Sequence, residues 1–561
     1  MIHSKEHLSK QTIHYFKESI KDLFFSKRGS RAARLTIMLC SLLIVFNALN
    51  VYNSYIGRDF ISSIEKSDFA KFIFYAFLYS TVFIISSGVG AIYRYSEESL
   101  GILWREHLTR SFTERYLDRR SYHYLANDFS LPNPDQRITE DVKAFTTTTL
   151  SFLLLFIGSL ITTVLFSGVL WTINPILFLV AVGYAIFGSY ITIQVGTPLI
   201  HLNYNQLDLE ATFRADLVHI RENTEQLAIS HNEIRFSHRL GLKLNRLAHN
   251  IKKIIGVNLR LVFVTNSYNY FIQIIPALII APSYMRGEVE FGVITQSSMA
   301  FTTLIGAFSL IVTQFQSISS FSAVISRLQQ LSDSLNEIQV HFSQDHSKYV
   351  LSENLFFRKV TIINHDTKKL IVKDLSLNLV TSERLLTSTS EDTQKLAIFR
   401  TTARIWQPES GTIGRPETDQ MIFLSERPYL PPGTLRTILT SFDQSLETSD
   451  QEIIHVLELL RLGLTLKRIG SLIEDLDWHD ELSIEEQHLI AVARVIIAKP
   501  KFVFMDRPSS TLAKVEIENI LKLFREKEIG TIILSKGDES KFRYDKHLEI
   551  FSDGTWKITT S

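Results

Sequence analysis

The first half of the chain alternates between long apolar runs and charged connecting stretches. Six runs of about 20 residues contain no Asp, Glu, Lys or Arg, and an apolar helix of that length crosses a hydrocarbon core about 30 Å thick. They occupy residues 36–56, 72–93, 150–171, 176–195, 261–281 and 291–312. Buried helices of soluble proteins rarely stay uncharged over such lengths, so the pattern predicts six membrane-spanning helices.

The connections between these runs differ in length and charge. Residues 94–149 and 196–260 form long, charged connections with a helical pattern. The short connections are residues 57–71, 172–175 and 282–290. Residues 1–35 form an amphipathic segment rich in Lys and Arg, and such an excess of positive charge marks the cytoplasmic side of a membrane. We therefore expect both long connections and both termini in the cytoplasm.

The second half of the chain has the pattern of a soluble α/β domain. Over residues 348–561, short apolar runs such as "KFVFMD" and "GTIILS" have the composition of strands, and helical patterns separate the later ones. This alternation is typical of a largely parallel sheet. The expected fold is an α-helical six-span membrane domain over residues 36–330, a linker over residues 331–347 and this α/β domain.

Charge and composition exclude several classes of function. The 59 basic and 58 acidic residues leave a net charge of +1, which argues against a dedicated nucleic-acid binder. The single cysteine, Cys40, excludes an intramolecular disulfide. The 17 histidines show no paired spacing typical of metal ligands, so we expect no metal site. The lipid bilayer is the first partner that the pattern implies.

Three stretches of the second half follow one another in a diagnostic order. They are "ERLLTSTSEDTQKLAIFRTTARIW" (383–406), "FLSERPYLPPGTLR" (423–436) and "LSIEEQHLIAVARVIIAKPKFVFMDRPSSTLA" (482–513). This order resembles that of an ABC-transporter nucleotide-binding domain, in which an LSxxEQ signature opens a helix and a later apolar strand ends in an aspartate. The long charged connections likewise look like the intracellular arms of the ABC exporter-type membrane fold.

Three stretches of the first half support a narrower resemblance. They are "NPDQRITEDVKAF" (133–145), "EATFRADLVHIRENTEQLAI" (210–229) and "AVISRLQQL" (323–331). They are similar to the SbmA/BacA-like branch with a fused ATPase domain, which is related to the peroxisomal half-transporters. The resemblance implies a P-loop-like C-terminal domain with ATP and Mg²⁺ as its cofactors.

The turn that matches the Walker A loop in position and length departs from the pattern GxxxxGK[ST]. Glycines in such a loop let consecutive backbone N–H groups wrap the phosphates. Here Thr389 and Gln394 occupy the glycine positions. Glu391 and Asp392 bring carboxylates into the loop, and Leu396 replaces the Ser or Thr that should hold Mg²⁺. The loop therefore predicts a degenerate phosphate site.

The other nucleotide positions that the resemblance implies are partly retained and partly replaced. The retained residues are Lys395, Ser483, Gln487 and Asp506. The replacements are Glu426 for the glutamine near the γ-phosphate, Glu485 for the signature glycine, Arg507 for the catalytic carboxylate, Ala513 for the D-loop aspartate, and Gly537 or a neighbour for the switch histidine. We expect no catalytic residue and at most weak ATP–Mg²⁺ binding, with contacts from Lys395, Asp506, Ser483, Gln487 and Glu426.

Polar residues inside the predicted spans are candidates for a substrate cavity, because amides in a membrane are costly unless they are paired or face water. They are Asn47, Asn50, Asn266, Asn269, Gln273, Gln296 and Gln314. Helix packing is the alternative explanation for them. Glu210 and Glu222 lie in the arm between the fourth and fifth spans and are candidates for coupling to the C-terminal domain. Their alternative is a salt-bridged helix face.

These features predict a half-transporter of a bacterial inner membrane that acts as a homodimer, since six spans enclose half of the usual cavity. The resemblance implies import of peptides or similarly bulky hydrophilic compounds, a class that includes antimicrobial peptides and corrinoids. Three functions stay open. They are ATP-driven transport at an unorthodox site, transport driven by an ion gradient such as that of protons, and a non-transporting membrane scaffold or regulator.

Overall fold

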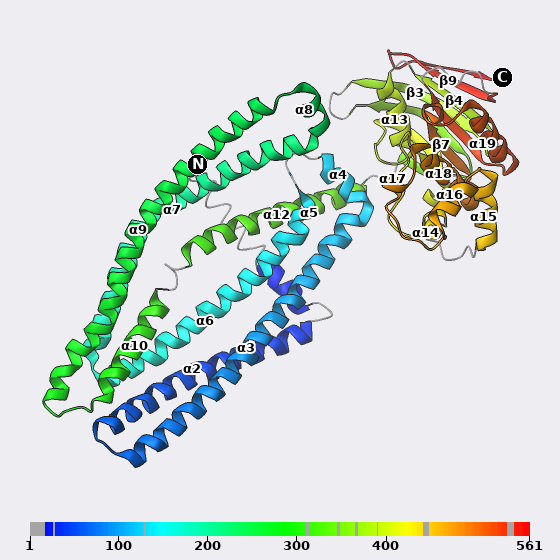
Figure 1. Ribbon diagram of the computed structural model, residues 1–561. Helices are drawn as coiled ribbons and strands as arrows, with labels where there is room; N and C mark the ends of the chain where they lie inside the picture. Colours follow the sequence, from blue (N-terminus) through cyan, green and yellow to red (C-terminus); the bar gives the residue numbers. More distant parts are fainter. Residues whose placement is uncertain are drawn as a thin grey trace. The chain divides into compact units, whose positions relative to one another are not determined.

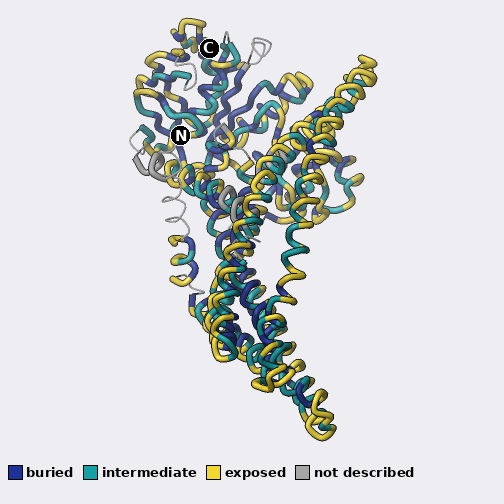
Figure 2. The backbone as a smooth tube through the Cα atoms, turned by 90° about the vertical axis from the view of Figure 1, so that its left-hand side faces the viewer, coloured by how far each residue is buried: buried dark blue, intermediate teal, exposed yellow. Residues whose placement is uncertain are grey.

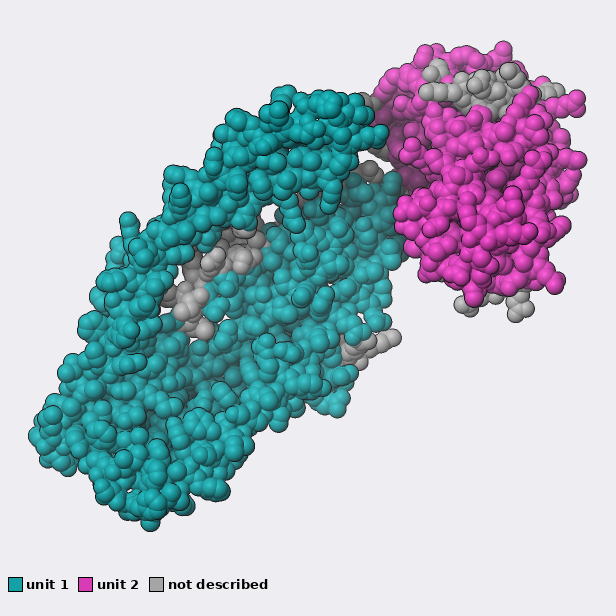
Figure 3. All heavy atoms as spheres, in the orientation of Figure 1, with its two compact units in different colours: residues 1–340 teal, residues 341–561 magenta. Residues whose placement is uncertain are grey.

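The computed structural model divides the chain into two compact units, residues 1–340 and residues 341–561, termed unit 1 and unit 2 (Figure 3). The residues that it describes are 17–25, 29–127, 131, 133–309, 314–344, 348–364, 369–389, 391–440, 448–535 and 543–560. Each unit has its own hydrophobic core, so each is considered by itself.

Unit 1 is built from long helices (Figure 1). They are α2 (Gly29–Glu65), α3 (Phe69–Leu117), α6 (Val142–Ile173), α7 (Pro175–Glu222), α9 (Glu233–Met285), α10 (Gly292–Phe308) and α12 (Phe315–Gln344). Short connecting elements are η1 (Asp118–Arg120), α4 (Ser121–Asn127), α5 (Pro134–Gln136), the π-helical η2 (Arg137–Asp141) and α8 (Thr224–Ser230). Asn174 separates α6 from α7, because its side chain accepts a hydrogen bond from the Ile176 N–H and Pro175 takes the first helical position.

Several of these helices suit a membrane environment. Within the described residues, five helical stretches are long and apolar enough to cross a membrane, namely Gly29–Glu65, Phe69–Ala126, Pro134–Ile173, Pro175–Glu222 and Glu233–Met285. Large apolar side chains such as Phe77, Ile84 and Phe187 are more than half exposed on them, and Figure 2 shows exposed positions along their length. Lipid covers such surfaces at no hydrophobic cost. The sixth predicted span contains α10, and its residues 310–312 lie outside the described part.

The helices α7 and α9 extend far beyond a membrane. They contain 48 and 53 residues, which at 1.5 Å per residue gives lengths of roughly 70–80 Å. They pack side by side, with α8 at their common tip (Figure 1). Asp216 of α7 joins them, since its carboxylate lies 2.8 Å from Arg239 Nε and 2.6 Å from Lys243 Nζ. The helical arm predicted over residues 196–260 is thus present.

The described residues of unit 2 form two sheets. The four-stranded sheet has the order β1 (Tyr349–Leu351), β5 (Ser410–Arg415), β2 (Leu355–Ile363) and β3 (Leu370–Leu379). The six-stranded sheet has the order β10 (Trp556–Thr560), β9 (Lys546–Ile550), β4 (Arg384–Thr389), β8 (Gly530–Ser535), β7 (Phe502–Asp506) and β6 (Met421–Leu424). In the second sheet β9, β4, β8, β7 and β6 are parallel neighbours, and only β10 is antiparallel. The largely parallel sheet is the one predicted from the sequence.

Helices cover this second sheet and position the loops at its edge. They are α13 (Asp392–Thr402), α14 (Leu435–Leu439), α15 (Asp450–Leu459), α16 (Gly463–Ile469), α17 (Trp478–Glu481), α18 (Ile484–Ala498) and α19 (Lys514–Glu526), with the short turns η4 (Thr418–Gln420) and η5 (Pro508–Ser510). Every residue of β7 is buried. Because parallel strands end at the same edge, the loops after β4, β6 and β7 lie where ligands bind in α/β sheets.

Candidate functional site

The turn between β4 and α13 is closed by its own side chains. At the start of α13 the Glu391 carbonyl accepts a hydrogen bond from the Gln394 N–H at 3.1 Å, and the Gln394 side chain accepts one from the Glu391 N–H at 3.4 Å. Gln394 also donates to the Phe551 carbonyl at 2.5 Å, and Glu391 Oε1 lies 3.3 Å from Lys369 Nζ. The first turn of a helix is a natural anion site, because its N–H groups lack helical partners. Here the Gln394 side chain already accepts from the N–H of Glu391, and the Glu391 and Asp392 carboxylates bring negative charge to the turn.

The retained lysine of this turn is buried and paired. The Lys395 side chain is 1% exposed, and its Nζ lies 2.8 Å from Asp506 Oδ1 and 3.8 Å from Asp392 Oδ1. Neither Lys395 Nζ nor Asp506 Oδ1 is aligned for a hydrogen bond, so their contact is a pairing of charges. Since Asp506 ends β7, this pair joins α13 to the neighbouring edge of the sheet.

Arg507, directly after β7, extends the pairing. Its backbone is left-handed, with φ of 45°, a conformation that costs a non-glycine residue roughly 1–2 kcal/mol. Its guanidinium lies 2.5 Å from Glu426 Oε2 and 3.9 Å from Asp506 Oδ1. Charges of alternating sign therefore run through Asp392, Lys395, Asp506, Arg507 and Glu426, a set that we term the ion-pair chain. It connects the turn after β4, the end of β7 and the loop after β6.

The start of α18, which carries the LSxxEQ signature, is engaged in local bonds. The Ser483 hydroxyl accepts from the Glu486 N–H at 3.2 Å, and Glu486 accepts from the Ser483 N–H at 2.9 Å. Gln487 is buried and donates to the Leu482 carbonyl at 2.9 Å, whereas Glu485 is exposed. Ser483 and Gln487 thus bond within their own helix start, while Lys395, Asp506 and Glu426 meet in the ion-pair chain.

His488 of the same helix was not singled out in the sequence, and it lies beside the ion-pair chain. Its Nδ1 is 3.0 Å from the Thr511 hydroxyl, and the ring is 2% exposed. Burial lowers the pKa of His488, although bonds to the Ile484 and Ser425 backbone and the charge of Glu426 oppose that shift. The sequence carries no signal for the position of His488, because its neighbours Ser425, Glu426 and Thr511 come from other segments of the chain.

The structure separates the amides of the predicted spans into two groups. Asn47 is buried, donates to the Leu43 carbonyl at 2.9 Å and accepts from the Thr162 hydroxyl at 2.6 Å, so it packs α2 against α6. Gln296 is 2% exposed on α10, and its amide has no hydrogen-bond partner among the described residues. In contrast, the exposed or partly exposed amides are Asn50, Asn266, Asn269, Gln273 and Gln314.

The two coupling candidates lie on the surface of α7. Glu222 is exposed near the arm tip, and Glu210 is exposed with its carboxylate accepting from Gln206 at 2.8 Å. That bond is one turn along the same helix, as a solvated helix face would have. Gly537, the expected place of the switch histidine, lies outside the described residues.

A helical membrane unit followed by an α/β unit of this topology is the architecture of an ABC half-transporter. Comparison with known families agrees, because residues 20–285 match the family described as ABC transporter transmembrane region 2. An uncharacterized ABC transporter ATP-binding protein of Synechocystis sp. is 34% identical, with 93% of this chain and 81% of that protein covered. The chain belongs to the ABC transporter family and has the two units of a half-transporter, and the predicted fold class is confirmed.

Two further relatives come from other kingdoms. ABC transporter D family member 2, chloroplastic, of Arabidopsis thaliana is 29% identical, with 87% of this chain and 79% of the relative covered. The human lysosomal cobalamin transporter ABCD4 is 24% identical, with 99% of this chain and 97% of the relative covered. The similarity therefore extends over both units.

Proposed function

We propose that this half-transporter pairs with a second copy in a bacterial inner membrane, with both termini in the cytoplasm, and moves peptides or similarly bulky hydrophilic compounds. The proposal includes the narrower relationship to the SbmA/BacA-like branch. It also includes a membrane domain over residues 36–330, a linker over residues 331–347 and a C-terminal domain over residues 348–561. This last domain carries the degenerate ATP site and hydrolyses ATP negligibly.

The ion-pair chain is the observation that supports a degenerate ATP site. Lys395 and Asp506, which the family resemblance assigns to phosphate and Mg²⁺, pair with each other at 2.8 Å. A nucleotide would have to break this pair and would also meet the carboxylate of Glu391. Two like unit charges 4 Å apart repel by about 4 kcal/mol at an effective dielectric constant near 20. These residues do not fit a triphosphate, and they support weak ATP–Mg²⁺ binding at most.

The residue after β7 supports the absence of hydrolysis. Attack of water on a phosphate is assisted by a general base, and such a group typically contributes about 10²- to 10⁴-fold to the rate. Arg507 stands at the position implied for this base, and its cation already pairs with Glu426. A guanidinium cannot accept a proton from water, so the site lacks this contribution.

An exposed polar stripe on α9 supports a translocation path. Asn266, Asn269 and Gln273 are three and four residues apart, so they lie on one face of the helix, and all three are exposed within a predicted span. Polar side chains inside a membrane normally face the bundle interior or a water-filled cavity. We infer that this stripe lines a cavity that the second copy completes.

The chemistry of the stripe supports an amide-rich substrate. Side-chain amides both donate and accept hydrogen bonds, so they suit peptide bonds and the carboxamides of corrinoids. The relative named a lysosomal cobalamin transporter supports the corrinoid class. Asn50 and Gln314, both partly exposed, are further cavity candidates in this proposal, and Glu210 and Glu222 are its coupling candidates.

A second candidate follows from the ion-pair chain itself. If the C-terminal domain consumes no ATP, transport requires another source of energy, and a proton gradient is the one we infer. In that case the C-terminal domain has only a structural role. A scaffold or regulator without transport is the remaining alternative.

Reconstitution of the purified protein into vesicles distinguishes these functions. We expect ATP hydrolysis no faster than in protein-free vesicles, and uptake of a fluorescent peptide or of cobalamin that depends on an imposed proton gradient. ATP hydrolysis that drives uptake without a gradient would overturn the proposed degenerate site. Uptake of neither probe under any condition would favour a scaffold. Native mass analysis in detergent tests the homodimer, and monomers at every concentration would contradict it.

A further inference from the structure

A second group of buried charges lies at the start of α6. Asp141 and Arg137 are each 4% exposed, which is rare for ionised residues. Asp141 accepts two bonds from Arg327 of α12, at 2.7 Å from Nε and 2.6 Å from Nη2. Arg137 donates to the Arg327 carbonyl at 2.8 Å and lies 3.3 Å from Gln330 Oε1. Two guanidinium groups therefore hold α12 against the start of α6.

The two arginines near Asp141 differ in how readily they can move away from its carboxylate. Arg327 is 46% exposed, so water can solvate its guanidinium if α12 moves away. Arg137 is buried and lies four residues before Asp141, a spacing that makes side chains neighbours on an α-helix. Departure of α12 would remove the bidentate partner of Asp141. A buried charge without a partner is strongly unfavourable, so Asp141 would then pair with Arg137.

The backbone here also supports two arrangements. Arg137–Asp141 is a π-helical turn, the form that occurs mostly as single wide turns within α-helices and often at functional sites. Asn133, just before this segment, has a left-handed backbone with φ of 53°. Tightening the wide turn to an α-helical one would rotate Arg137 relative to Asp141. The apolar contacts of Ile138 with the core that includes Leu328 would then change as well.

We propose that Asp141 exchanges counterions during the transport cycle, pairing with Arg327 when α12 is docked on α6 and with Arg137 when α12 has moved away. Because α12 follows the sixth predicted span along the chain, its docking couples that span to the start of the third. The exchange needs no nucleotide, so it stands independently of the proposed role of the ion-pair chain.

Pulsed EPR on the full-length protein in lipid vesicles tests this exchange without any substrate. Cys40→Ser removes the native cysteine, and spin labels are placed at the exposed positions Lys143 and Glu337, near the start of α6 and on α12. We expect two distances between the labels, a shorter one with α12 docked on α6 and a longer one with α12 moved away. Arg327→Gln should enrich the longer one, because it removes the cation that docks α12, and should change the ratio of populations by about 5- to 30-fold.

Arg137→Gln is the decisive counterpart. Its amide can still donate to the Arg327 carbonyl but carries no charge for Asp141, so it should enrich the shorter distance. Arg327→Lys, which keeps the charge without the two-bond geometry, should fall between wild type and Arg327→Gln. A single unchanged distance in all variants, or a shift of Arg327→Gln and Arg137→Gln in the same direction, would overturn the proposal.

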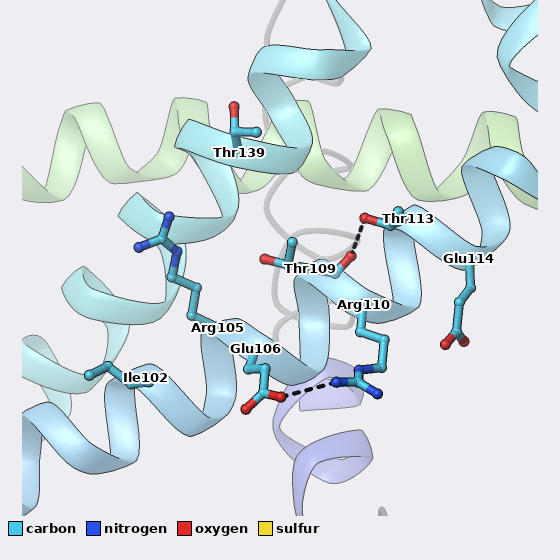
Figure 4. A pocket seen from close by; sticks show the side chains of 8 residues that line it. All are labelled: Ile102, Arg105, Glu106, Thr109, Arg110, Thr113, Glu114 and Thr139. Carbon is cyan, nitrogen blue, oxygen red and sulfur yellow. Dashed lines mark hydrogen bonds and ion pairs between the residues drawn. The ribbon is translucent and has the colours of Figure 1, made fainter. Parts of the chain in front are cut away.

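A matched control is available on α3. Arg110 pairs with Glu106 one turn away at 3.1 Å, and Figure 4 shows both among the side chains that line a surface pocket. Arg110→Gln removes one arginine from the same unit but from a pair that water solvates. Its distance distribution should match wild type, and a shift as large as that of Arg327→Gln would show that the effect is not specific to Asp141.

Discussion

Two buried carboxylates, Asp506 in unit 2 and Asp141 in unit 1, are neutralised in different ways. Asp506, whose side chain is 10% exposed, pairs with Lys395, whose side chain is 1% exposed, so both partners are buried. Asp141 pairs with Arg327, which is 46% exposed, and has a second cation within one turn. The comparison indicates that an ion pair with both partners buried stays fixed, which we term a static tie. A buried charge with one exposed partner and a second counterion nearby can instead change partners.

The largest effect is expected from breaking the static pair. Lys395→Met keeps the apolar volume but leaves the Asp506 carboxylate without its cation, and breaking a buried pair typically costs about 3–5 kcal/mol. The double variant Lys395→Met with Asp506→Leu removes both charges and should recover most of this loss. Denaturant unfolding, monitored by hydrogen exchange of the β7 amides, measures the free energy of unfolding of both variants. Equal stability of wild type and Lys395→Met would contradict the static tie.

A smaller effect is expected where the ion-pair chain reaches the surface. Arg507 and Glu426 are 29% and 37% exposed, so water screens their attraction. A double-mutant cycle with Arg507→Gln and Glu426→Gln should give a coupling energy of about 1 kcal/mol, near the low end for contacting residues. The matched pair Arg525 and Asp545, on the surface of the same unit at 3.2 Å, should give less. A coupling energy of zero would show that Arg507 and Glu426 do not attract each other, so Glu426 would not belong to the ion-pair chain.

The lowered pKa of His488 predicts a dependence of stability on pH. Burial disfavours the protonated ring in the folded protein, so the contribution to stability is complete above the unfolded pKa near 6.5 and is lost as the pH falls below it. One group changes the free energy of unfolding by at most about 1.4 kcal/mol per pH unit. Between pH 7 and pH 5.5, unfolding curves of His488→Gln should depend less on pH than those of wild type. Parallel curves would show that other groups titrate.

The smallest effect concerns the Glu391 carboxylate at the start of α13. It pairs with Lys369 at 3.3 Å, and the two side chains are 42% and 62% exposed, so Glu391→Ala should reduce stability by less than about 1 kcal/mol. The same change removes a negative charge beside the first turn, so tripolyphosphate should bind more tightly to the variant than to wild type by calorimetry. Glu485→Ala removes an exposed carboxylate from the start of α18 and serves as the control. If both variants bind tripolyphosphate alike, Glu391 does not block the turn.

Much of the architecture follows from local patterns in the sequence. The uncharged apolar runs predicted the membrane helices, and the order of the strands and signature predicted an ABC-type domain that the relatives confirm. The missing glycines of the turn were also visible, because a backbone that must wrap a phosphate needs them at specific positions. The pairing of Glu391 with Lys369 was not predicted, because the two residues lie 22 positions apart in the chain.

The sequence by itself determined which segments suit lipid, which suit a parallel sheet and which residues stand at the nucleotide positions, because these depend on composition and spacing within short stretches. Only the tertiary structure decided which charged and amide side chains contact one another. Arg507 meets Glu426 across 81 residues, and Arg327 meets Asp141 across 186. It also separated Asn47, bonded to Thr162, from the exposed amides of α9. Charges and amides carry no mark of their partners, which depend on how distant helices and strands pack.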